Sequence, residues 1–257
     1  MELSASDHFE SRVVRTVVVG SIAPLGNKLL ADLPEAEASI IESLLERIDL
    51  KAREVIAEPG DEVAWIHFPE TAVISYVTVV GDGGVESLIV GSEGATGLPI
   101  LSGARTSFVR VVGQTAGSTR RAAAADILAA LPGLPELRRR MALYVQLGFD
   151  TLSQSAACNR MHVTEERCAR WLLVSRDRAG RDEFGLTQAF LSQMLGVRRP
   201  AVTVAIGILA RAGYLSHTRG RIRIEDSEGL KRVSCECYEQ IRRREEELFE
   251  RDGSPAS

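Results

Sequence analysis

The sequence predicts an α+β chain with an N-terminal β-roll of the jelly-roll type, a long dimerisation helix and a C-terminal winged helix-turn-helix. Short β-rich runs with Gly-rich turns between them fill much of residues 55–119. An apolar repeat with alternating steps of four and three follows over residues 137–158. Finally, the 40 residues from Gly185 to Ile224 contain six arginines and no acidic residue. Such a window suits contact with phosphate.

The charge of the chain is divided unevenly. The whole sequence of 257 residues has a formal net charge of −4, yet residues 160–232 hold 14 basic against 8 acidic side chains. A basic segment on an otherwise acidic chain indicates a nucleic-acid contact that is confined to one domain. The length allows two modest domains, each with its own core.

The N-terminus and the cysteines indicate the compartment. Residues 1–23 lack a signal-peptide pattern and are expected to form a flexible leader. No apolar run is long enough to span a bilayer, so we expect no membrane partner. Four cysteines are too few for a disulfide scaffold in a chain of this size. A cytoplasmic location follows from these features.

The β-roll is expected over residues 24–132. Asn27 is predicted to cap a short helix that runs through Leu33, and Pro34 to open a second helix over residues 35–45. Pro59-Gly60-Asp61 and Gly81-Asp82-Gly83-Gly84 provide turns. The expected strands are Val55-Ile56, Trp65 to Phe68, Val73 to Val77, Val85 to Val90, Phe108 to Val112 and Thr115 to Thr119.

The dimerisation helix is expected over residues 133–160. Its four-three repeat predicts a coiled-coil seam with a second copy of the chain, in which small residues allow close approach. The alternative is a helix that packs on its own roll, because apolar stripes usually face a core. The predicted seam consists of Leu137, Met141, Tyr144, Gly148, Thr151 and Ser155, and continues to Cys158.

The DNA-binding domain is expected over residues 161–232. A helix over residues 165–178 precedes two short helices, and Thr187 caps the first of them. Gly196 makes the turn between the two, and Pro200 is tolerated in the first turn of the second. Residues 214–224 form a hairpin around Thr218-Arg219-Gly220. Residues 233–257 are predicted to be a charged, solvated helix and tail.

This order of parts resembles the Crp/Fnr family of bacterial transcription regulators over about residues 27–230. The strongest motif is the segment from Leu186 to Arg199, which matches the family's two-helix reader in length and in its turn glycine. Pro59-Gly60-Asp61 and Asp82-Gly83 match two turns of the family's cyclic-nucleotide-binding-like roll. The resemblance implies a homodimer that binds a palindromic operator in double-stranded DNA, with RNA polymerase as a further candidate partner.

The resemblance also predicts an effector region, which departs from the family pattern. Gly97, Leu98, Arg105 and Thr106 are the candidate effector-binding residues. Arg105-Thr106 matches the family's pair for the cyclic phosphate, but Ala95 or Leu98 replaces the ribose-binding glutamate. The lost charge-assisted hydrogen bonds, about 1.5–3 kcal/mol each, predict that the protein does not respond to cyclic AMP. The effector stays unknown.

Two sensors of the family are not supported by the sequence. No cysteine precedes Cys158, so the N-terminal cysteine group of the iron–sulfur branch is missing. His67 is expected to be a packed or surface histidine and not a haem ligand. We expect no cofactor.

Arg199 is the best candidate for a base contact, because a guanidinium fork matches the two acceptors of guanine. Arg198, Thr203 and Val204 are expected to add base or methyl contacts. Thr187, Gln188, Arg219 and Arg221 are expected to hold phosphates. The rival interpretation of the arginine-rich window is a solvated basic face of an interaction domain.

Two further classes of function remain as alternatives. A metal-dependent jelly-roll enzyme needs clustered His and carboxylate ligands on strands, yet only one of the four histidines lies in the β region. We therefore expect no enzyme and no catalytic site. A thiol- or metal-responsive regulator would use Cys158, Cys235 and Cys237. Two cysteines one residue apart are a weak metal signal, so we expect no metal site.

Overall fold

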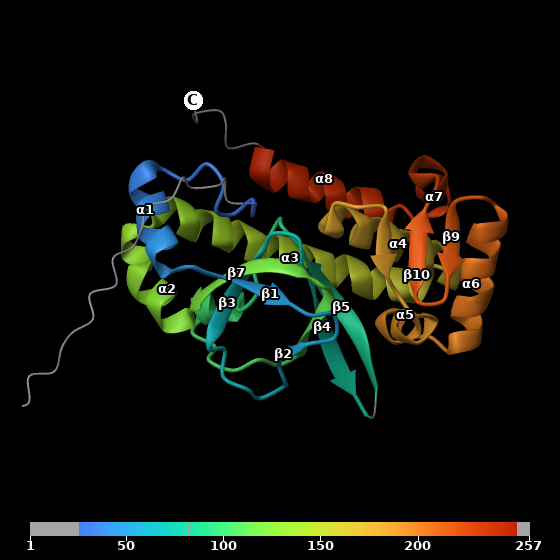
Figure 1. The fold of residues 1–257 in the computed structure, drawn as a ribbon, viewed down its shortest axis with the longest axis horizontal. Coiled ribbons are helices and arrows are strands. Elements are labelled where there is room, and N and C mark those ends of the chain that lie inside the picture. Colours follow the sequence, from blue (N-terminus) through green and yellow to red (C-terminus); the bar gives the residue numbers. More distant parts are fainter. Residues whose placement is uncertain (1–25, 82, 251–257) are drawn as a thin grey trace, which may run out of the picture.

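The computed structural model describes residues 26–81 and 83–250. A β-roll lies beside one long helix, α3 (Pro135–Met161), and a winged helix-turn-helix lies at the far end of that helix (Figure 1). The predicted α+β class and the order of the parts are confirmed. The predicted leader, residues 1–23, and residues 251–257 of the tail lie outside the described residues.

The N-terminal part contains one helix, not two. α1 (Glu35–Leu44) begins after Pro34, as predicted. The expected helix from Asn27 to Leu33 is wrong, because that segment is a series of turns. The Asn27 side chain is buried and holds the segment to the roll, since its Nδ2 donates to the carbonyl oxygens of Pro69 and Gly94 at 2.9 and 2.8 Å. Its Oδ1 also accepts a 3.0 Å hydrogen bond from the Leu29 amide, so Asn27 caps a turn and not a helix.

The roll consists of two antiparallel sheets. The first has the order β1 (Glu46–Leu50), β7 (Gly117–Ala123), β3 (Trp65–Pro69). The second has the order β2 (Val55–Ala57), β6 (Arg110–Thr115), β4 (Val73–Val80), β5 (Gly83–Val90). All the predicted strands are present with shifted ends, and β1 was missed. A short 3-10 helix, η1 (Leu98–Ser102), lies between β5 and β6.

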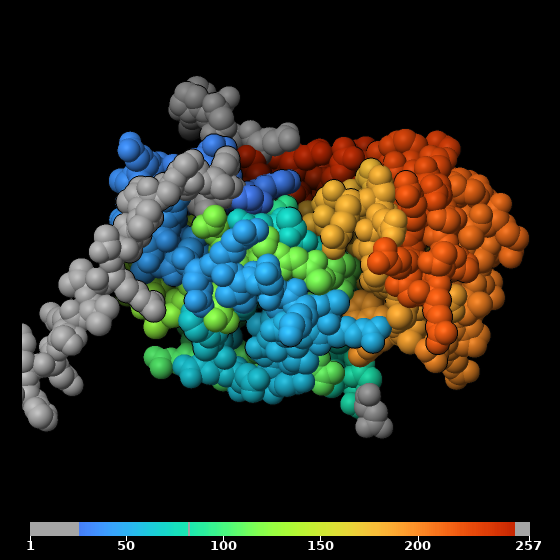
Figure 2. Space-filling model, in the orientation of Figure 1, coloured from blue at the N-terminus to red at the C-terminus, as the bar shows by residue number. Residues whose placement is uncertain are grey.

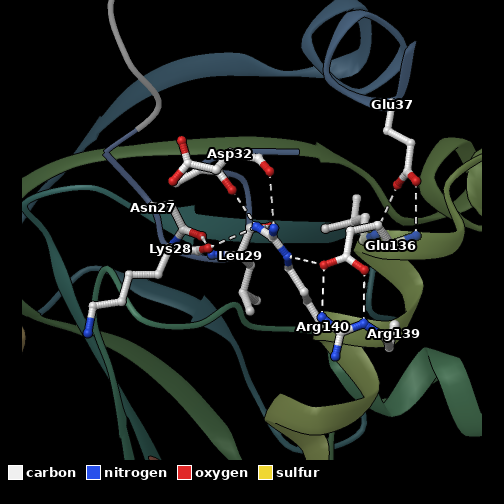
Figure 3. A network of polar contacts seen from close by, with 10 residues as sticks. Asn27, Lys28, Leu29, Asp32, Glu37, Glu136, Arg139 and Arg140 are labelled. Atoms are coloured by element: carbon white, nitrogen blue, oxygen red, sulfur yellow. Dashed lines mark hydrogen bonds and ion pairs between the residues drawn. The ribbon is translucent and has the colours of Figure 1, made fainter. Parts of the chain in front are cut away.

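The long helix follows α2 (Ala124–Ala130) and the 3-10 turn η2 (Leu131–Gly133), neither of which was predicted. Figure 3 shows how its first turn is fixed. The carboxylate of Glu37 on α1 accepts hydrogen bonds of 3.0 Å from the backbone amides of Glu136 and Leu137, where the helix dipole favours negative charge. Arg140 reaches from α3 to the carbonyl oxygens of Leu29 and Asp32.

The predicted dimer seam on α3 needs correction, because the structure uses that face inside the chain. Leu137, Met141 and Tyr144 are at most 4 % exposed and belong to the core of the chain's own roll. A Cβ on Gly148 would lie 3.8 Å from Leu88 of β5, so this glycine also faces the roll. The alternative, a helix packed on its own roll, describes this face. Of the predicted seam, Leu137, Met141, Tyr144 and Gly148 face the roll, and Thr151 and Ser155 are half-buried.

The winged helix-turn-helix follows the prediction closely. α4 (Thr164–Ala179) precedes β8 (Glu183–Gly185), α5 (Gln188–Leu195), α6 (Arg199–Arg211) and the hairpin of β9 (Leu215–Thr218) and β10 (Arg221–Ile224). The Thr187 hydroxyl caps α5 by accepting from the Phe190 amide at 3.2 Å. The turn residue Gly196 has φ +63°, which favours glycine. β8 adds an unpredicted third strand in the order β8-β10-β9.

The C-terminal helix is packed and not solvated on all sides. After α7 (Ser227–Val233), α8 (Cys237–Glu250) lies along α3 (Figure 1). Leu248 and Phe249 pack against the roll core. Arg244 of α8 pairs with Asp150 of α3 at 2.7 Å. The prediction of a solvated helix overlooked this amphipathic pattern because charged residues surround the few apolar ones.

The roll and the helix-turn-helix share a hydrophobic core. Val73 and Val77 of β4, with Ile89 of β5, pack with residues of α4 and α5, whereas Ile74 of β4 faces the roll interior. The two units are in contact in the space-filling view, where the blue and green roll meets the orange helices (Figure 2). A Cβ on Gly196 would lie 2.8 Å from Val85 of β5, so the turn itself touches the roll.

Candidate DNA interface and effector region

The second helix of the helix-turn-helix turns one face inward and one outward. Val202, Ile206 and Leu209 are at most 2 % exposed, as their spacing predicts. Arg199, Thr203 and Val204 lie on the exposed face, and Val204 is 54 % exposed. Helix α6 is at the outer end of the molecule (Figure 1), so its exposed face is open to a ligand as large as a DNA groove.

Three exposed arginines carry uncompensated charge at this end of the chain. Over residues 26–81 and 83–250, no hydrogen bond or ion pair engages the guanidinium groups of Arg198, Arg199 or Arg219. Arg221 differs, because it pairs with Glu183 at 2.8 Å. Both of these side chains are largely exposed, so the pair is weak and Arg221 can exchange it for a phosphate.

A groove of about 450 Å³ separates the helices from the wing. Arg199 lines one side of it, and Arg219 and Arg221 line the other. The structure therefore brings the predicted base-reading arginine and the predicted phosphate-binding arginines of the wing to one concave surface. Thr187 and Gln188 line the same groove.

Three further predicted contact residues, Thr187, Gln188 and Thr203, already have partners inside the chain. The Thr187 hydroxyl accepts a 3.2 Å hydrogen bond from Arg53, which lies in the turn between β1 and β2 of the roll. Thr203 donates to the Gln188 side chain at 2.9 Å, which links the two helices. Sequence reasoning did not single out Arg53, because its approach to α5 depends on the docking of the two units.

The candidate effector residues do not form one site. Leu98 is 5 % exposed and belongs to the roll core with Ala95 and Ile100. The Gly97 amide donates to the Tyr76 hydroxyl at 2.9 Å. Arg105 and Thr106 lie on the exposed surface of the loop before β6. The side chains at the position of the missing glutamate therefore fill the roll, while the two residues matching the phosphate pair face solvent.

His67 was expected to be either packed or on the surface. The structure buries it on β3. Burial, with a smaller contribution from Arg121, lowers the pKa of His67 to about 4, so the ring is neutral.

A half-buried carboxyl group lies between the roll and the DNA-binding domain. Glu86 of β5 accepts hydrogen bonds of 2.6 Å from the Ser75 hydroxyl of β4 and the Trp171 indole of α4. Burial raises the pKa of Glu86 to about 8, although both hydrogen bonds oppose the shift. The folded chain therefore keeps this carboxyl group protonated at neutral pH.

We expect Glu86→Gln to remove a pH dependence of stability. A folded pKa near 8 and an unfolded one near 4.5 mean that the folded chain holds an extra proton between these values. The free energy of unfolding therefore falls as the pH rises through this window, by about 1–2 kcal/mol after allowance for partial exposure. The uncharged amide should flatten this fall. Thermal unfolding at pH 5 and pH 8 measures it, with the exposed Glu62→Gln as control. An unchanged slope in Glu86→Gln would contradict the assignment.

An ion network joins the roll, α4 and α8. Arg178 of α4 lies 3.3 Å from Glu93 after β5 and 2.7 Å from Glu245 of α8. Burial alone lowers the pKa of Arg178, but the two carboxylates outweigh it and raise that pKa. Glu93 also accepts a 3.0 Å hydrogen bond from Tyr144 of α3. Four parts of the chain thus meet at one buried cation.

A second apolar stripe on α3 is exposed. Val145, Phe149 and Leu152 are 45, 66 and 43 % exposed, and the spacing of four and three continues to exposed alanines at both ends. This stripe is displaced by one residue from the predicted seam, or about 100° around the helix. We call it the exposed stripe; its members are Ala142, Val145, Phe149, Leu152 and Ala156.

The described chain thus combines a β-roll with a winged helix-turn-helix whose exposed face carries arginines. Residues 166–233 match the Crp-like helix-turn-helix domain family. Comparison with curated protein sequences gives no match.

Solved structures share the fold over about three quarters of this chain. FixK2 from Bradyrhizobium japonicum is 14 % identical with a TM-score of 0.63, over 74 % of this chain and 98 % of its own. A putative transcriptional regulator of the Crp/Fnr family from Eubacterium rectale is 16 % identical with a TM-score of 0.61, over 79 and 95 %. The c-di-GMP-responsive regulator CLP from Xanthomonas campestris is 12 % identical with a TM-score of 0.61, over 74 and 99 %. The matched domain is confined to residues 166–233, and the solved structures show that the overall fold is shared.

In the described part of the chain, no helix combines the length and the apolar character that crossing a membrane requires.

Proposed function

We propose that the protein is a homodimeric, sequence-specific DNA-binding transcription regulator that does not respond to cyclic AMP. The observation that carries this proposal is the exposed N-terminal half of α6, where Arg198 and Arg199 have free guanidinium groups beside the wing. A helix presented in this way fits the major groove. Since its target is the chromosome, the protein acts in the cytoplasm, and RNA polymerase is its candidate partner at promoters.

The proposed dimer seam is the exposed stripe of α3. Its heptad spacing suits a parallel helix pair. Phe149 is 66 % exposed, and covering it with a second copy of the chain would remove this apolar surface from water. The pairing of two α3 helices places the α6 helices on one side of the dimer. A palindromic operator with half-sites about one turn of DNA apart is the target that this symmetry requires.

The operator contacts divide into base readout and phosphate binding. Arg199, with Arg198, Thr203 and Val204 on the same exposed region, meets base edges. Arg219 and Arg221 on the wing, with Thr187 and Gln188 at the start of α5, lie along the groove where a backbone would pass. Because Thr187 and Gln188 already have partners in the chain, the arginines of the wing carry most of the phosphate binding.

Arg199→Ala is expected to weaken binding to the selected operator by about 1–3 kcal/mol and to relax the preference at one base pair of each half-site. Arg221→Ala is expected to weaken all sequences alike and to reduce the salt dependence of binding. Selection of binding sites from random DNA with purified full-length protein, followed by titrations at several salt concentrations, measures both effects. Equal changes of sequence preference in the two variants would contradict the division into base reader and phosphate clamp.

Cyclic AMP is expected to give no saturable binding and no change of operator affinity. Leu98 fills the roll interior, and neither Leu98 nor Ala95 can accept a hydrogen bond from a ribose hydroxyl with its side chain. Calorimetry on the purified protein decides this point. A micromolar dissociation constant together with tighter operator binding would overturn it. CLP is named as responsive to c-di-GMP, so that dinucleotide is the second compound to titrate.

A further inference from the structure

Three cysteines and a histidine from distant parts of the sequence meet where the long helix ends. Cys158 is in the last turn of α3, and His162 directly follows that helix. Cys235 precedes α8, and Cys237 is its first residue. The four ligand atoms all lie within 4.8 Å of one another, the only such grouping of three or more potential metal ligands found among the described residues.

The distances are those of a single coordination sphere. The sulfur atoms of Cys158 and Cys235 are 3.5 Å apart, and the Cys237 sulfur is 3.6 Å from Nδ1 of His162. A tetrahedral zinc ion with bonds of about 2.3 Å to sulfur holds its ligand atoms about 3.8 Å apart. These two pairs differ from that spacing by only a few tenths of an ångström, and no pair of donors exceeds it by more than about 1 Å.

The surroundings orient the donors toward the centre. Nε2 of His162 lies 3.1 Å from a carboxylate oxygen of Glu236, so a proton on Nε2 leaves the lone pair of Nδ1 free for the ion. Such a carboxylate behind a histidine is the usual outer contact of a metal-bound imidazole. On the other side, Nε2 of Gln154 donates to the Cys237 sulfur at 3.0 Å.

Positively charged arginines of α4 offset the negative charge of the site. Three thiolates and one divalent ion leave a single negative charge. The positive charge of Arg170 acts on Cys158 and Cys235, and its Nε is buried without a hydrogen-bond partner in the described chain. Arg167 also carries its positive charge beside these two thiols. Cys168, the remaining cysteine, lies in the core of the DNA-binding domain, apart from the cluster.

We propose that Cys158, His162, Cys235 and Cys237 form a tetrahedral Cys₃His site for one zinc-type divalent ion. Imidazole and thiolate together select zinc over magnesium or calcium. As each metal–sulfur bond forms, a protonated thiol releases its proton to solvent, and no electron is transferred. The ion links the segment between α3 and α4 to the residues at the start of α8. It fixes the hinge that sets the position of the helix-turn-helix.

The test is a titration of the reduced, chelator-treated full-length protein with Co²⁺, followed by displacement with Zn²⁺. We expect one equivalent per chain, with sulfur-to-cobalt charge-transfer bands and the intense visible bands of tetrahedral Co²⁺, and a rise in melting temperature on loading. The proposal would be overturned if the wild-type protein failed to bind either ion at one equivalent per chain. This outcome does not depend on whether the protein binds DNA.

Variants locate the site. Cys235→Ser and His162→Gln are expected to abolish the tetrahedral spectrum, and Glu236→Gln to lower affinity by about 10–100-fold. Cys168→Ala is the matched control, because it removes a buried thiol outside the cluster. Far-ultraviolet circular dichroism checks that each variant is folded. A full spectrum in both ligand variants, or its loss in Cys168→Ala, would show that the ion binds elsewhere.

Discussion

Phe149→Glu is expected to convert the protein to a monomer at micromolar concentration and to reduce specific operator binding by at least about 100-fold. Phe149 is the most exposed of the large apolar residues in the exposed stripe on α3. Across a two-fold axis, the substitution places two like charges in an apolar seam, where an unpaired charge costs several kcal/mol. Operator binding then falls because one helix-turn-helix contacts only half of a palindrome.

Sedimentation or light scattering measures the mass, and titration of the selected operator measures the affinity. Phe108→Glu is the matched control, because Phe108 is 85 % exposed and belongs to the loop before β6 of the roll and not to α3. We expect this control to remain a dimer with unchanged DNA binding. If Phe149→Glu were still a dimer at micromolar concentration, the dimer interface would lie on another surface of the chain.

Arg178→Met is expected to lower the free energy of unfolding by about 3 kcal/mol and the melting temperature by about 6–12 °C. The side chains of Glu93 and Glu245 are only 3 and 14 % exposed, so both carboxylates would lose their shared cation in a dry environment. The expected loss in the free energy of unfolding is at the low end of the range for breaking a buried ion pair. The reason is that Glu93 keeps hydrogen bonds from Tyr144 and the Gly91 amide.

Arg176→Met provides the control on the same helix. Arg176 pairs with Asp182, which is 56 % exposed, and such surface pairs contribute at most about 1 kcal/mol. Thermal unfolding of both variants, with the Trp171 fluorescence as a probe of the boundary between roll and α4, compares them directly. Similar melting temperatures for the two variants would mean that the network at Arg178 adds little to the docking of the units.

The helix-turn-helix was the part most accessible from sequence. Thr187, Gly196 and Pro200 act through local backbone chemistry, and Val202, Ile206 and Leu209 through the period of one helix. These signals need no knowledge of distant residues. The turn from Asn27 to Leu33 was predicted wrongly for the opposite reason, because Asn27 hydrogen-bonds to Pro69 and Gly94 far along the chain.

The sequence alone determined the order of the parts, the arginine-rich window of residues 185–224 and the lack of a carboxylate where the resemblance places a ribose-binding glutamate. Only the tertiary structure decided which stripe of α3 is free. The helix carries two heptad patterns one residue apart, and both satisfy the periodicity of a coiled coil. Packing against the roll buries the pattern that contains Met141 and leaves the one that contains Phe149 exposed. Periodicity records which residues share a face of a helix, whereas the partner of that face depends on contacts between distant segments. The meeting of Cys158 with Cys235 has the same origin, since 77 residues separate them along the chain.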